Sequence, residues 1–325
     1  MIFFFFFPLQ ECPLENLINV NLSYCEFIKK LPKLWAPNLE ILKLTGCKNL
    51  VKLTELGAPN LRYLDLSKCE NLVNLPELWA PNLRYLDLSG CENLVEIDEC
   101  FGSLEKLSRW DLTYCRKLQI LPSQLRLKSL YSFCLTGCSR LEKLPNFHPE
   151  MECLNNLELQ GSGIREVPSS IEHLSKLEVL RLFKCKNLGD LPDSIYKLQQ
   201  LMWLDTPTAK LRPTCDSFDG SSGYGFVNMT GLYFKGYEGI IELDLLMKPD
   251  YFPALEDLNL SSTNIVTIPE SISRFPRLKR LSATNCKLLR EIQGLPQSIR
   301  MVDVEGSMLL NTSPSGLFNQ VSLFL

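Results

Sequence analysis

Residues Asn60 to Leu94 read NLRYLDLSKCENLVNLPELWAPNLRYLDLSGCENL, and the first 13 letters of this stretch return as its last 13 with a single change. The two copies begin at Leu61 and Leu83, which lie 22 residues apart. Within each copy the apolar residues follow the frame L-x-x-L-x-L-x-x-C-x-x-L. Self-similarity at a period of about 20–50 residues indicates a stack of repeated structural units.

The same frame recurs along nearly the whole chain. Its first apolar position returns in steps of 21 to 24 residues, apart from one step of 54 residues after Leu201. The positions are Leu17, Leu39, Leu61, Leu83, Leu107, Leu130, Leu154, Leu177, Leu201, Leu255, Leu278 and Ile299. This spacing is typical of leucine-rich repeats, whose period is about 20–29 residues. We therefore predict an α/β solenoid: a leucine-rich-repeat horseshoe with a parallel β-sheet on its concave face and mostly irregular or 3-10 turns on its convex face.

The frame gives each apolar position a physical role. Alternate residues of a strand point to the same face, so Leu64 and Leu66 of one copy are predicted to enter the core together. A proline often follows the last apolar position, as Pro76 and Pro122 do. Because proline lacks a backbone N–H, we expect no regular helix at these places.

Eight of the 13 cysteines occupy one slot of the frame: Cys25, Cys47, Cys69, Cys91, Cys115, Cys138, Cys185 and Cys286. We expect their side chains to be buried and to offer a weak hydrogen bond to a loop carbonyl. A catalytic cysteine is the alternative, but a nucleophile needs one cysteine beside a base rather than eight in register. The odd count and the periodic placement favour reduced thiols in a reducing compartment.

The composition argues against several classes of function. The 34 Lys and Arg nearly balance the 37 Asp and Glu, so no basic patch for nucleic acid is expected. No apolar run reaches the length of about 20 residues that spans a bilayer. With only two histidines, no Cys-x-x-Cys pair and no G-x-x-x-x-G-K-[ST] phosphate loop, the chain shows no metal or nucleotide motif. We therefore expect no enzyme activity, no cofactor, no nucleic-acid partner and no membrane contact.

The repeats divide the chain into three parts. Residues 1–12 form an atypical N-terminal segment, residues 13–314 form a solenoid of about 12–13 repeats, and residues 315–325 form an apolar tail. The tail would cap the solenoid or begin a further domain, because repeat stacks need protected ends. The long step is predicted to hold an irregular loop near 206–228, and Gly231 to Leu243 reads as a degenerate repeat.

Outward positions on the predicted strands give two candidate protein-binding clusters on the concave face. The first contains Tyr63, Tyr85 and Arg109 beside Asp65, Asp87 and Asp111, and the second contains Arg181, Phe183 and Trp203. Aromatic residues and arginine are enriched at binding hot spots. Adjacent carboxylates on a ladder repel one another, so we interpret the Asp row as not favoured by folding and expect its removal to cost no stability. The alternative is a solvated face copied by repeat duplication, since the two tyrosine-containing strands are identical strings.

Three stretches carry a resemblance to a known family. NLVNLPELWAPNLRYLDLSGCENL, from Asn71, and SIEHLSKLEVLRLFKCKNLGDLPDSIYKL, from Ser170, resemble the leucine-rich-repeat region of plant TIR-NB-LRR disease-resistance proteins, and PQSIRMVDVEGSMLL, from Pro296, looks like the end of that region. The resemblance implies a scaffold that senses a pathogen effector or a host protein. It also implies contact with a nucleotide-binding domain, in cis or in trans, that the repeats hold inactive in the cytoplasm or the nucleus. A non-immune adaptor, such as the substrate-recognition arm of a ligase, is the alternative.

Overall fold

The computed structural model describes residues 14–76, 78–207, 226–237, 239, 241, 243 and 250–307. It contains two compact units, residues 1–174 and residues 175–325, here called the first and second units. The predicted segments 1–12 and 315–325, and most of the predicted loop near 206–228, lie outside the described residues.

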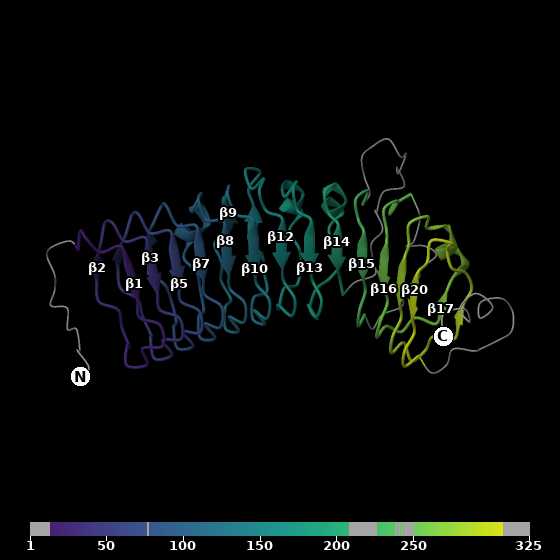
Figure 1. Ribbon diagram of the computed structural model, residues 1–325, viewed down its shortest axis with the longest axis horizontal. Coiled ribbons are helices and arrows are strands. Elements are labelled where there is room, and N and C mark those ends of the chain that lie inside the picture. Colours follow the sequence, from purple (N-terminus) through teal and green to yellow (C-terminus); the bar gives the residue numbers. More distant parts are fainter. Residues whose placement is uncertain are drawn as a thin grey trace. The chain divides into compact units, whose positions relative to one another are not determined.

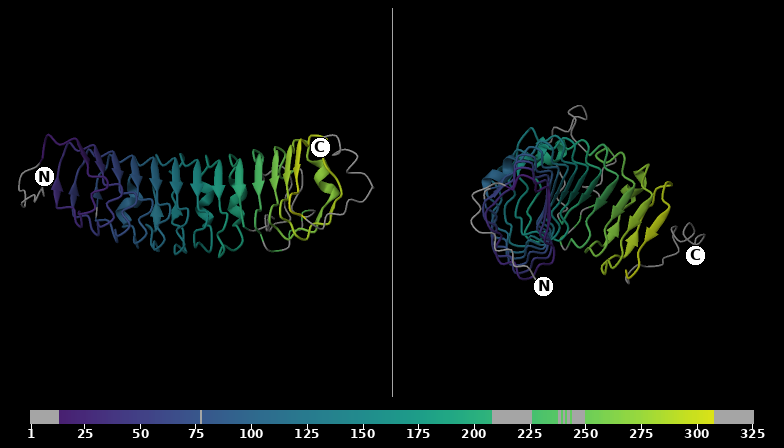
Figure 2. Two further views of the ribbon diagram at one scale, coloured as in Figure 1. Left: turned by 60° about the horizontal axis from the view of Figure 1, so that its bottom comes forward. Right: turned by 60° about the vertical axis from the view of Figure 1, so that its left-hand side comes forward.

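Each repeat contributes one short strand to a parallel sheet (Figure 1). In the first unit these strands are β1 (Asn19–Asn21), β3 (Ile41–Lys43), β5 (Tyr63–Asp65), β7 (Tyr85–Asp87), β8 (Arg109–Asp111), β10 (Ser132–Cys134) and β12 (Asn156–Glu158). In the second unit they are β13 (Val179–Arg181), β14 (Trp203–Asp205), β15 (Gly231–Tyr233), β16 (Asp257–Asn259), β18 (Arg280–Ser282) and β20 (Met301–Asp303). Figure 2 shows the strands of each unit lying side by side. The predicted solenoid of stacked parallel strands is therefore confirmed.

The register of the strands follows the repeat frame. Leu42, Leu64 and Leu86 are paired across β3, β5 and β7, and all three are buried. The residues on either side of each central leucine point the other way, and together they form the surface that we call the strand face. The alternation predicted from the L-x-L pattern is thus the one observed.

Strand β15 (Gly231–Tyr233) lies within the 54-residue step between the repeats that begin at Leu201 and Leu255. It pairs with β14 on one side and with β16 on the other, so a repeat without the full leucine frame fills the gap. The degenerate repeat predicted at Gly231 is therefore present. Its central residue, Leu232, is fully buried like the leucines of the regular repeats.

The backs of the repeats contain short bridges and 3-10 turns. In the first unit β4 (Leu56–Gly57) pairs with β2 (Leu34–Trp35) on one side and with β6 (Leu78–Trp79) on the other. A second pair in that unit is formed by β9 (Gln124–Leu125) and β11 (Asn146–Phe147). In the second unit β17 (Thr267–Ile268) pairs with β19 (Glu291–Ile292). The 3-10 helices are η1 (Glu99–Ser103), η2 (Ser169–His173), η3 (Asp193–Lys197) and η4 (Glu270–Arg274). Pro168, Pro192 and Pro269 cap the last three at their first turn, where a missing N–H costs nothing. The predicted 3-10 turns are confirmed, whereas the sequence analysis missed the short back strands.

The slot cysteines lie where the frame predicts. Cys69, Cys91 and Cys115 are buried free thiols, and their Sγ atoms donate to the carbonyl oxygens of Leu44, Leu66 and Leu88, one repeat earlier, at 3.1 to 3.2 Å. Burial raises the pKa of the Cys69 thiol to about 12. A thiol held in the neutral form is a poor nucleophile, which supports the structural role over the catalytic one. Cys25, in the first described repeat, is only half-buried.

A left-handed residue precedes the slot in most repeats. Gly90 and Gly137 adopt φ of 74° and 75° there, and Lys68 and Tyr114 adopt φ of 58° and 60° at the same step of their own repeats. An L-residue in this region is strained, whereas glycine is not. The single difference between the two copies in the opening stretch, Lys68 for Gly90, therefore falls on a strained position.

Candidate functional site

The first candidate surface lies on β3, β5, β7 and β8 of the first unit, and we call Lys43, Tyr63, Tyr85 and Arg109 the tyrosine patch. The strand register places Tyr63 beside Tyr85 and Tyr85 beside Arg109. The two rings stack with centroids 4.4 Å apart and an interplanar angle of 1°. Lys43 Nζ lies 5.4 Å from the Tyr63 ring centroid and Arg109 Cζ lies 5.9 Å from that of Tyr85. Each tyrosine ring thus contacts the other ring and one cation, and these contacts restrict the four side chains in the unbound protein.

The three aspartates beside this patch have a local role in folding. Asp65 Oδ1 accepts from the Ser67 backbone N–H at 2.9 Å, Asp87 Oδ1 from Ser89 at 2.8 Å, and Asp111 Oδ1 from Thr113 at 2.9 Å. Each carboxylate therefore caps the turn that follows its own strand. These hydrogen bonds give each aspartate a role in folding that the interpretation of the Asp row did not include, and they act against the repulsion between neighbouring carboxylates.

A sequence signal for this cap was available. Asn21 and Asn259 make the same bond to Ser23 and Ser261, because the bond needs only a side-chain carbonyl oxygen two residues before an N–H. The signal is therefore Asp or Asn at the end of a strand, followed two residues later by Ser or Thr.

The hydroxyl of Tyr85 joins the patch to the Asp row. It donates to Asp87 Oδ2 at 3.1 Å, so both oxygens of that carboxylate have partners. Burial, followed by the charge of Asp87, raises the pKa of Tyr85 above its usual value, and burial also raises that of Tyr63. Both phenols are therefore neutral at physiological pH and present hydrogen-bonding groups at the rim of the stack.

The second candidate surface lies on the second unit, and the tryptophan patch is defined as Arg181, Phe183, Trp203, Asp205, Tyr233 and Lys235. The predicted members lie on β13, directly after β13 and on β14. No ring contact joins Phe183 to Trp203 among the described residues. The ring partner of Trp203 is instead Tyr233, at 5.5 Å between centroids and 9° between planes. The sequence analysis missed Tyr233 because β15 lies beyond the long step, where the leucine frame is degenerate.

Gly231 permits this second stack. It pairs with Trp203 across β14 and β15, and a Cβ placed on it would lie 2.6 Å from Cε3 of Trp203 and 2.9 Å from Cε2 of Tyr233. Any other residue would push the two rings apart, since real Cβ contacts do not come so close. Glycine at this strand position therefore allows both aromatic rings to lie over the backbone.

Charged side chains surround the second stack. Tyr233 donates to Asp257 Oδ2 at 3.0 Å, and Arg280 Nε donates to the same oxygen at 2.9 Å. Phe183 lies among cations: Lys184 Nζ is 5.2 Å and Lys235 Nζ is 6.0 Å from its ring centroid. The patch thus combines the exposed ring of Trp203 and the half-buried rings of Phe183 and Tyr233 with two cations, Arg181 and Lys235, that form no ion pair with a carboxylate among the described residues.

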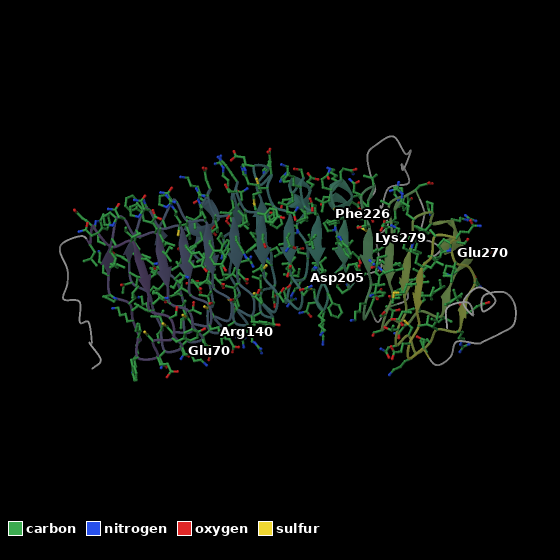
Figure 3. The ribbon with its side chains drawn as sticks, in the orientation of Figure 1. Glu70, Arg140, Asp205, Phe226, Glu270 and Lys279 are labelled. Carbon is green, nitrogen blue, oxygen red and sulfur yellow. The ribbon has the colours of Figure 1, made fainter. Side chains whose placement is uncertain are left out.

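Asp205, labelled in Figure 3, differs from the other aspartates at strand ends. Its Oδ1 is buried and has no hydrogen-bond partner in the part of the chain that the structure describes, and the residue two positions later is Pro207, which has no N–H to donate. Burial raises the pKa of this carboxyl to about 6, although Arg181 and Lys235 act in the opposite direction.

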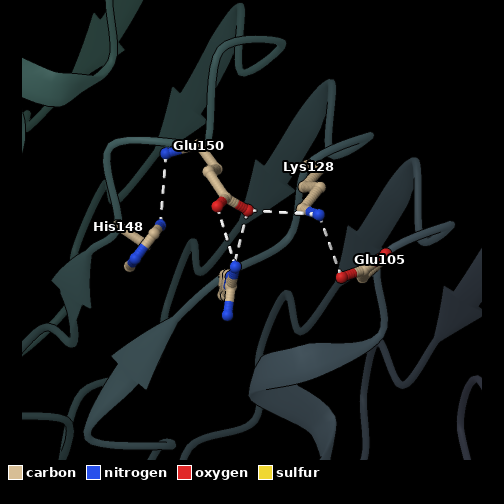
Figure 4. A network of polar contacts seen from close by, with 5 residues as sticks. Glu105, Lys128, His148 and Glu150 are labelled. Carbon is tan, nitrogen blue, oxygen red and sulfur yellow. Dashed lines mark hydrogen bonds and ion pairs between the residues drawn. The ribbon is translucent and has the colours of Figure 1, made fainter.

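A network of ion pairs on the first unit provides a contrast (Figure 4). Glu150 receives two hydrogen bonds from Arg126, at 2.8 and 3.0 Å, and Lys128 bridges Glu150 and Glu105 at 3.2 and 3.1 Å. Hydrogen bonds from these cations lower the pKa of Glu150 to about 2. The network links consecutive repeats. Because every charged member already has a partner, we interpret it as a contact that stabilises the stack of repeats rather than as a binding site.

The described residues offer little for other chemistry. Among them, no three His, Cys, Asp or Glu side chains are grouped so as to hold a metal ion. Nor does the described part of the chain contain a helix long and apolar enough to cross a membrane.

Comparison with known proteins gives consistent results. The family profile described as "Disease resistance protein RPS4B-like, leucine-rich repeats" matches residues 126–315, and a general leucine-rich-repeat profile matches residues 82–104. The TMV resistance protein N of Nicotiana glutinosa is 31% identical over 61% of this chain and 19% of its own length. The disease resistance-like protein DSC1 of Arabidopsis thaliana is 28% identical over 66% of this chain and 15% of its own length. The match thus covers only a small part of these curated relatives.

Among solved structures, the leucine-rich-repeat protein LIC12759 of Leptospira interrogans is 21% identical, with a TM-score of 0.47, over 90% of this chain and 91% of that one. The matching family profile covers more than half of the chain, and the named relatives are plant resistance proteins, as the sequence resemblance implied. The chain therefore belongs to the leucine-rich-repeat family of RPS4B-like disease resistance proteins.

Proposed function

We propose that this chain is the effector-sensing repeat region of a plant intracellular immune receptor, or of a truncated relative, and that it binds a pathogen effector or a host protein through its strand face. The observation that carries the proposal is the pair of stacked aromatic arrays, Tyr63 with Tyr85 and Trp203 with Tyr233. Cations lie over the rings of the first array, and both arrays are held on paired parallel strands.

The physical chemistry of these arrays favours protein recognition. Tyr, Trp and Arg dominate binding hot spots, and a buried anchor of this kind contributes at least about 2 kcal/mol at an interface centre. Stacking already restricts the rings, so little side-chain entropy remains to be lost on contact. The two patches therefore offer rigid contact area, which a merely solvated face copied by duplication does not require.

The same proposal includes a second partner and a compartment. Membership of the resistance-protein family supports contact between the repeats and a nucleotide-binding domain, in cis or in trans, which the repeats would hold inactive in the cytoplasm or the nucleus. It also favours an immune role over that of a ligase arm. We propose a non-catalytic role, because burial raises the pKa of slot thiols such as Cys69 and Cys138 and makes them poor nucleophiles.

Site-specific photocross-linking tests the binding face. A photoreactive residue replaces Ser132, on β10 beside Arg109, which leaves both patches intact. A second version carries it at Trp79, which is 58% exposed on the back of the first unit. In challenged plant cells we expect adducts from position 132 and not from position 79. The reverse pattern would show that partners bind the back of the repeats and would contradict the proposal.

A further inference from the structure

Asp205 occupies a position whose usual bond cannot form. Asp65 and Asp87 end their strands and accept a hydrogen bond from the N–H two residues later. For Asp205 that residue is Pro207, and Oδ1 is left buried without a partner. An unsatisfied buried oxygen is costly, and more so on an ionised carboxylate, so the position favours a neutral Asp205. The residue as a whole is only half-buried, so the rest of the carboxyl remains within reach of a partner on the strand face.

The neighbours of Asp205 give the second part of the argument. The register places Arg181 of β13 on one side and Tyr233 of β15 on the other, and Lys235 follows β15. Arg181 and Lys235 influence the carboxyl electrostatically, but neither forms an ion pair with it among the described residues. The Tyr233 hydroxyl is already committed to Asp257. Among the described residues, Arg181 and Lys235 thus both act on this carboxyl while their donors form no ion pair.

The charges around this point differ from those of the tyrosine patch. Lys43 and Arg109 there lie beside a row of three aspartates, each of which accepts a hydrogen bond from the backbone N–H two residues later. In the tryptophan patch, Arg181 and Lys235 act on the carboxyl of Asp205, whose neutral form is favoured by burial, and the nearby Asp257 is bound by Arg280 and Tyr233. A surface with surplus cations beside exposed aromatic rings is complementary to an acidic and partly apolar segment.

We infer that the strand face over β13 to β15 binds an acidic segment of a protein partner, with a partner carboxylate seated between Arg181 and Lys235 and with Asp205 setting the selectivity. This inference rests on the proposed function and specifies the chemistry of the partner. An incoming carboxylate would be repelled by ionised Asp205. After Asp205 takes one proton from the solvent, its hydroxyl donates to that carboxylate instead.

Because the complex takes up a proton, the affinity for the partner depends on pH. A nearby anion raises the pKa of Asp205 further, so the complex holds a proton that the free protein has largely released at neutral pH. Affinity therefore increases as pH falls from about 7.5 and levels off below about 6, where Asp205 is protonated in both states. The groups that face Asp205 are Arg181, Tyr233 and Lys235, and burial raises the pKa of Tyr233, which moves its proton exchange further above this range.

The probe is a library of random peptides displayed on phage and selected on the full chain at about pH 5.5. We expect the selected peptides to be enriched in Asp and Glu and depleted in Lys and Arg. Dissociation constants of one selected peptide are then measured at about pH 5.5 and about pH 7.5, with a weakening of about five- to tenfold expected at the higher pH. Arg181→Ala and Lys235→Ala should each weaken binding at least about fivefold.

Asp205→Asn is the decisive variant, since it keeps the shape and removes the charge. It should bind at about pH 7.5 as tightly as the unchanged chain binds at about pH 5.5, and it should lose the pH dependence. Asp65→Asn, in the first unit, is the matched control and should change neither property. Selection of basic or uncharged peptides, or a pH dependence that survives in Asp205→Asn, would overturn the inference. Neither result would affect the photocross-linking test, so failure of this inference and failure of the proposed function are distinguishable.

Discussion

The rings of Tyr63 and Tyr85 lie 4.4 Å apart and only 1° from parallel, although the two residues belong to different repeats. Their strands are neighbours in one parallel sheet, so the spacing of about 4.8 Å between strands becomes the stacking distance of the side chains. Repeating a tyrosine at this outward position is therefore sufficient to build a stack. The Trp203–Tyr233 stack arises differently. Trp203 is in register with Gly231, and the ring of Tyr233, two residues later and in register with Asp205, lies against the Trp203 ring over that glycine.

Combining Tyr85→Ala with Trp203→Ala should remove both stacks and weaken partner binding at least about tenfold. Neither residue lies in the core, so the far-UV circular dichroism spectrum and the cooperativity of unfolding should be retained. The measurement is the yield of photocross-linked adducts from position 132. Trp79→Ala is the control, because it removes an exposed ring that stacks on Trp35 at 6.0 Å on the back of the repeats. Equal losses from the control and the double variant would argue against the strand face.

Asp87 gives a test of the capping role. Asp87→Ala removes the acceptor for the Ser89 N–H and for the Tyr85 hydroxyl, and should lower the free energy of unfolding by about 1 kcal/mol. Asp87→Asn keeps one oxygen and should be nearly neutral. Leu86→Asp, which places a charge in the core, should cost several kcal/mol. Urea denaturation measures all three, and a stabilising Asp87→Ala would show that repulsion along the Asp row outweighs the cap.

The repeat period predicts most of the fold, because each apolar position performs the same task in every unit. That frame predicts the buried leucines and the prolines before η2, η3 and η4. It also predicts the buried thiols, which donate to a carbonyl oxygen of the preceding repeat. The back strands do not follow from it. They are two residues long, which is too short to show an alternating pattern.

The candidate site was only partly accessible from the sequence. The register between strands follows from the frame, so the contact between Tyr63 and Tyr85 could be anticipated. Tyr233 could not be placed, because its repeat lacks the regular leucine spacing and lies beyond the long step. The state of Asp205 depends on burial and on Pro207 together, and burial on a strand face is a property of the packed neighbours rather than of the local sequence.

The left-handed position before the cysteine slot should respond to glycine in a predictable way. Lys68→Gly relieves strain of about 1–2 kcal/mol and loses about 0.4–1 kcal/mol to the freer unfolded chain, so a net gain of about 0.5 kcal/mol is expected. Lys68→Ala keeps the strain and should be neutral. Thermal and urea unfolding of the two variants, compared with the unchanged chain, measure the difference.

The reverse substitution separates strain from steric clash. A Cβ on Gly90 would meet Lys68 at no less than 3.5 Å, whereas one on Gly137 would lie 2.5 Å from the ring of Tyr114. Gly90→Ala should therefore cost about 1 kcal/mol through strain alone, and Gly137→Ala should cost more. Tyr114→Ala combined with Gly137→Ala should remove the excess; if the excess remains, the ring is not its cause.

The slot thiols should be slow to react in the folded protein. Burial raises the pKa of Cys69 and of Cys138 to about 12, so little thiolate is present near neutral pH and reagents cannot reach the sulfur. Cys153, which is exposed, serves as the internal reference and should be labelled first. Mass spectrometry after brief alkylation gives the order, and urea should bring all sites to similar rates. Labelling of Cys69 as fast as Cys153 in the native protein would contradict its burial.

Asp205→Asn should stabilise the fold in a way that depends on pH. The carboxyl has a pKa of about 6 in the folded chain, against about 3.9 when unfolded, so the folded state binds more protons between these values. Asp205 therefore lowers the free energy of unfolding least below about pH 4. Its destabilising effect grows as pH rises from about 4 to about 6 and is constant at higher pH. Asparagine carries no such penalty, so the variant should gain about 1–2 kcal/mol in unfolding free energy at about pH 7.5 relative to its effect at about pH 4. Asp111→Asn, whose carboxylate caps its turn, is the matched control and should show no comparable gain at the higher pH. An equal effect of Asp205→Asn at both pH values would mean that the carboxyl titrates normally, and that Arg181 and Lys235 compensate for its burial.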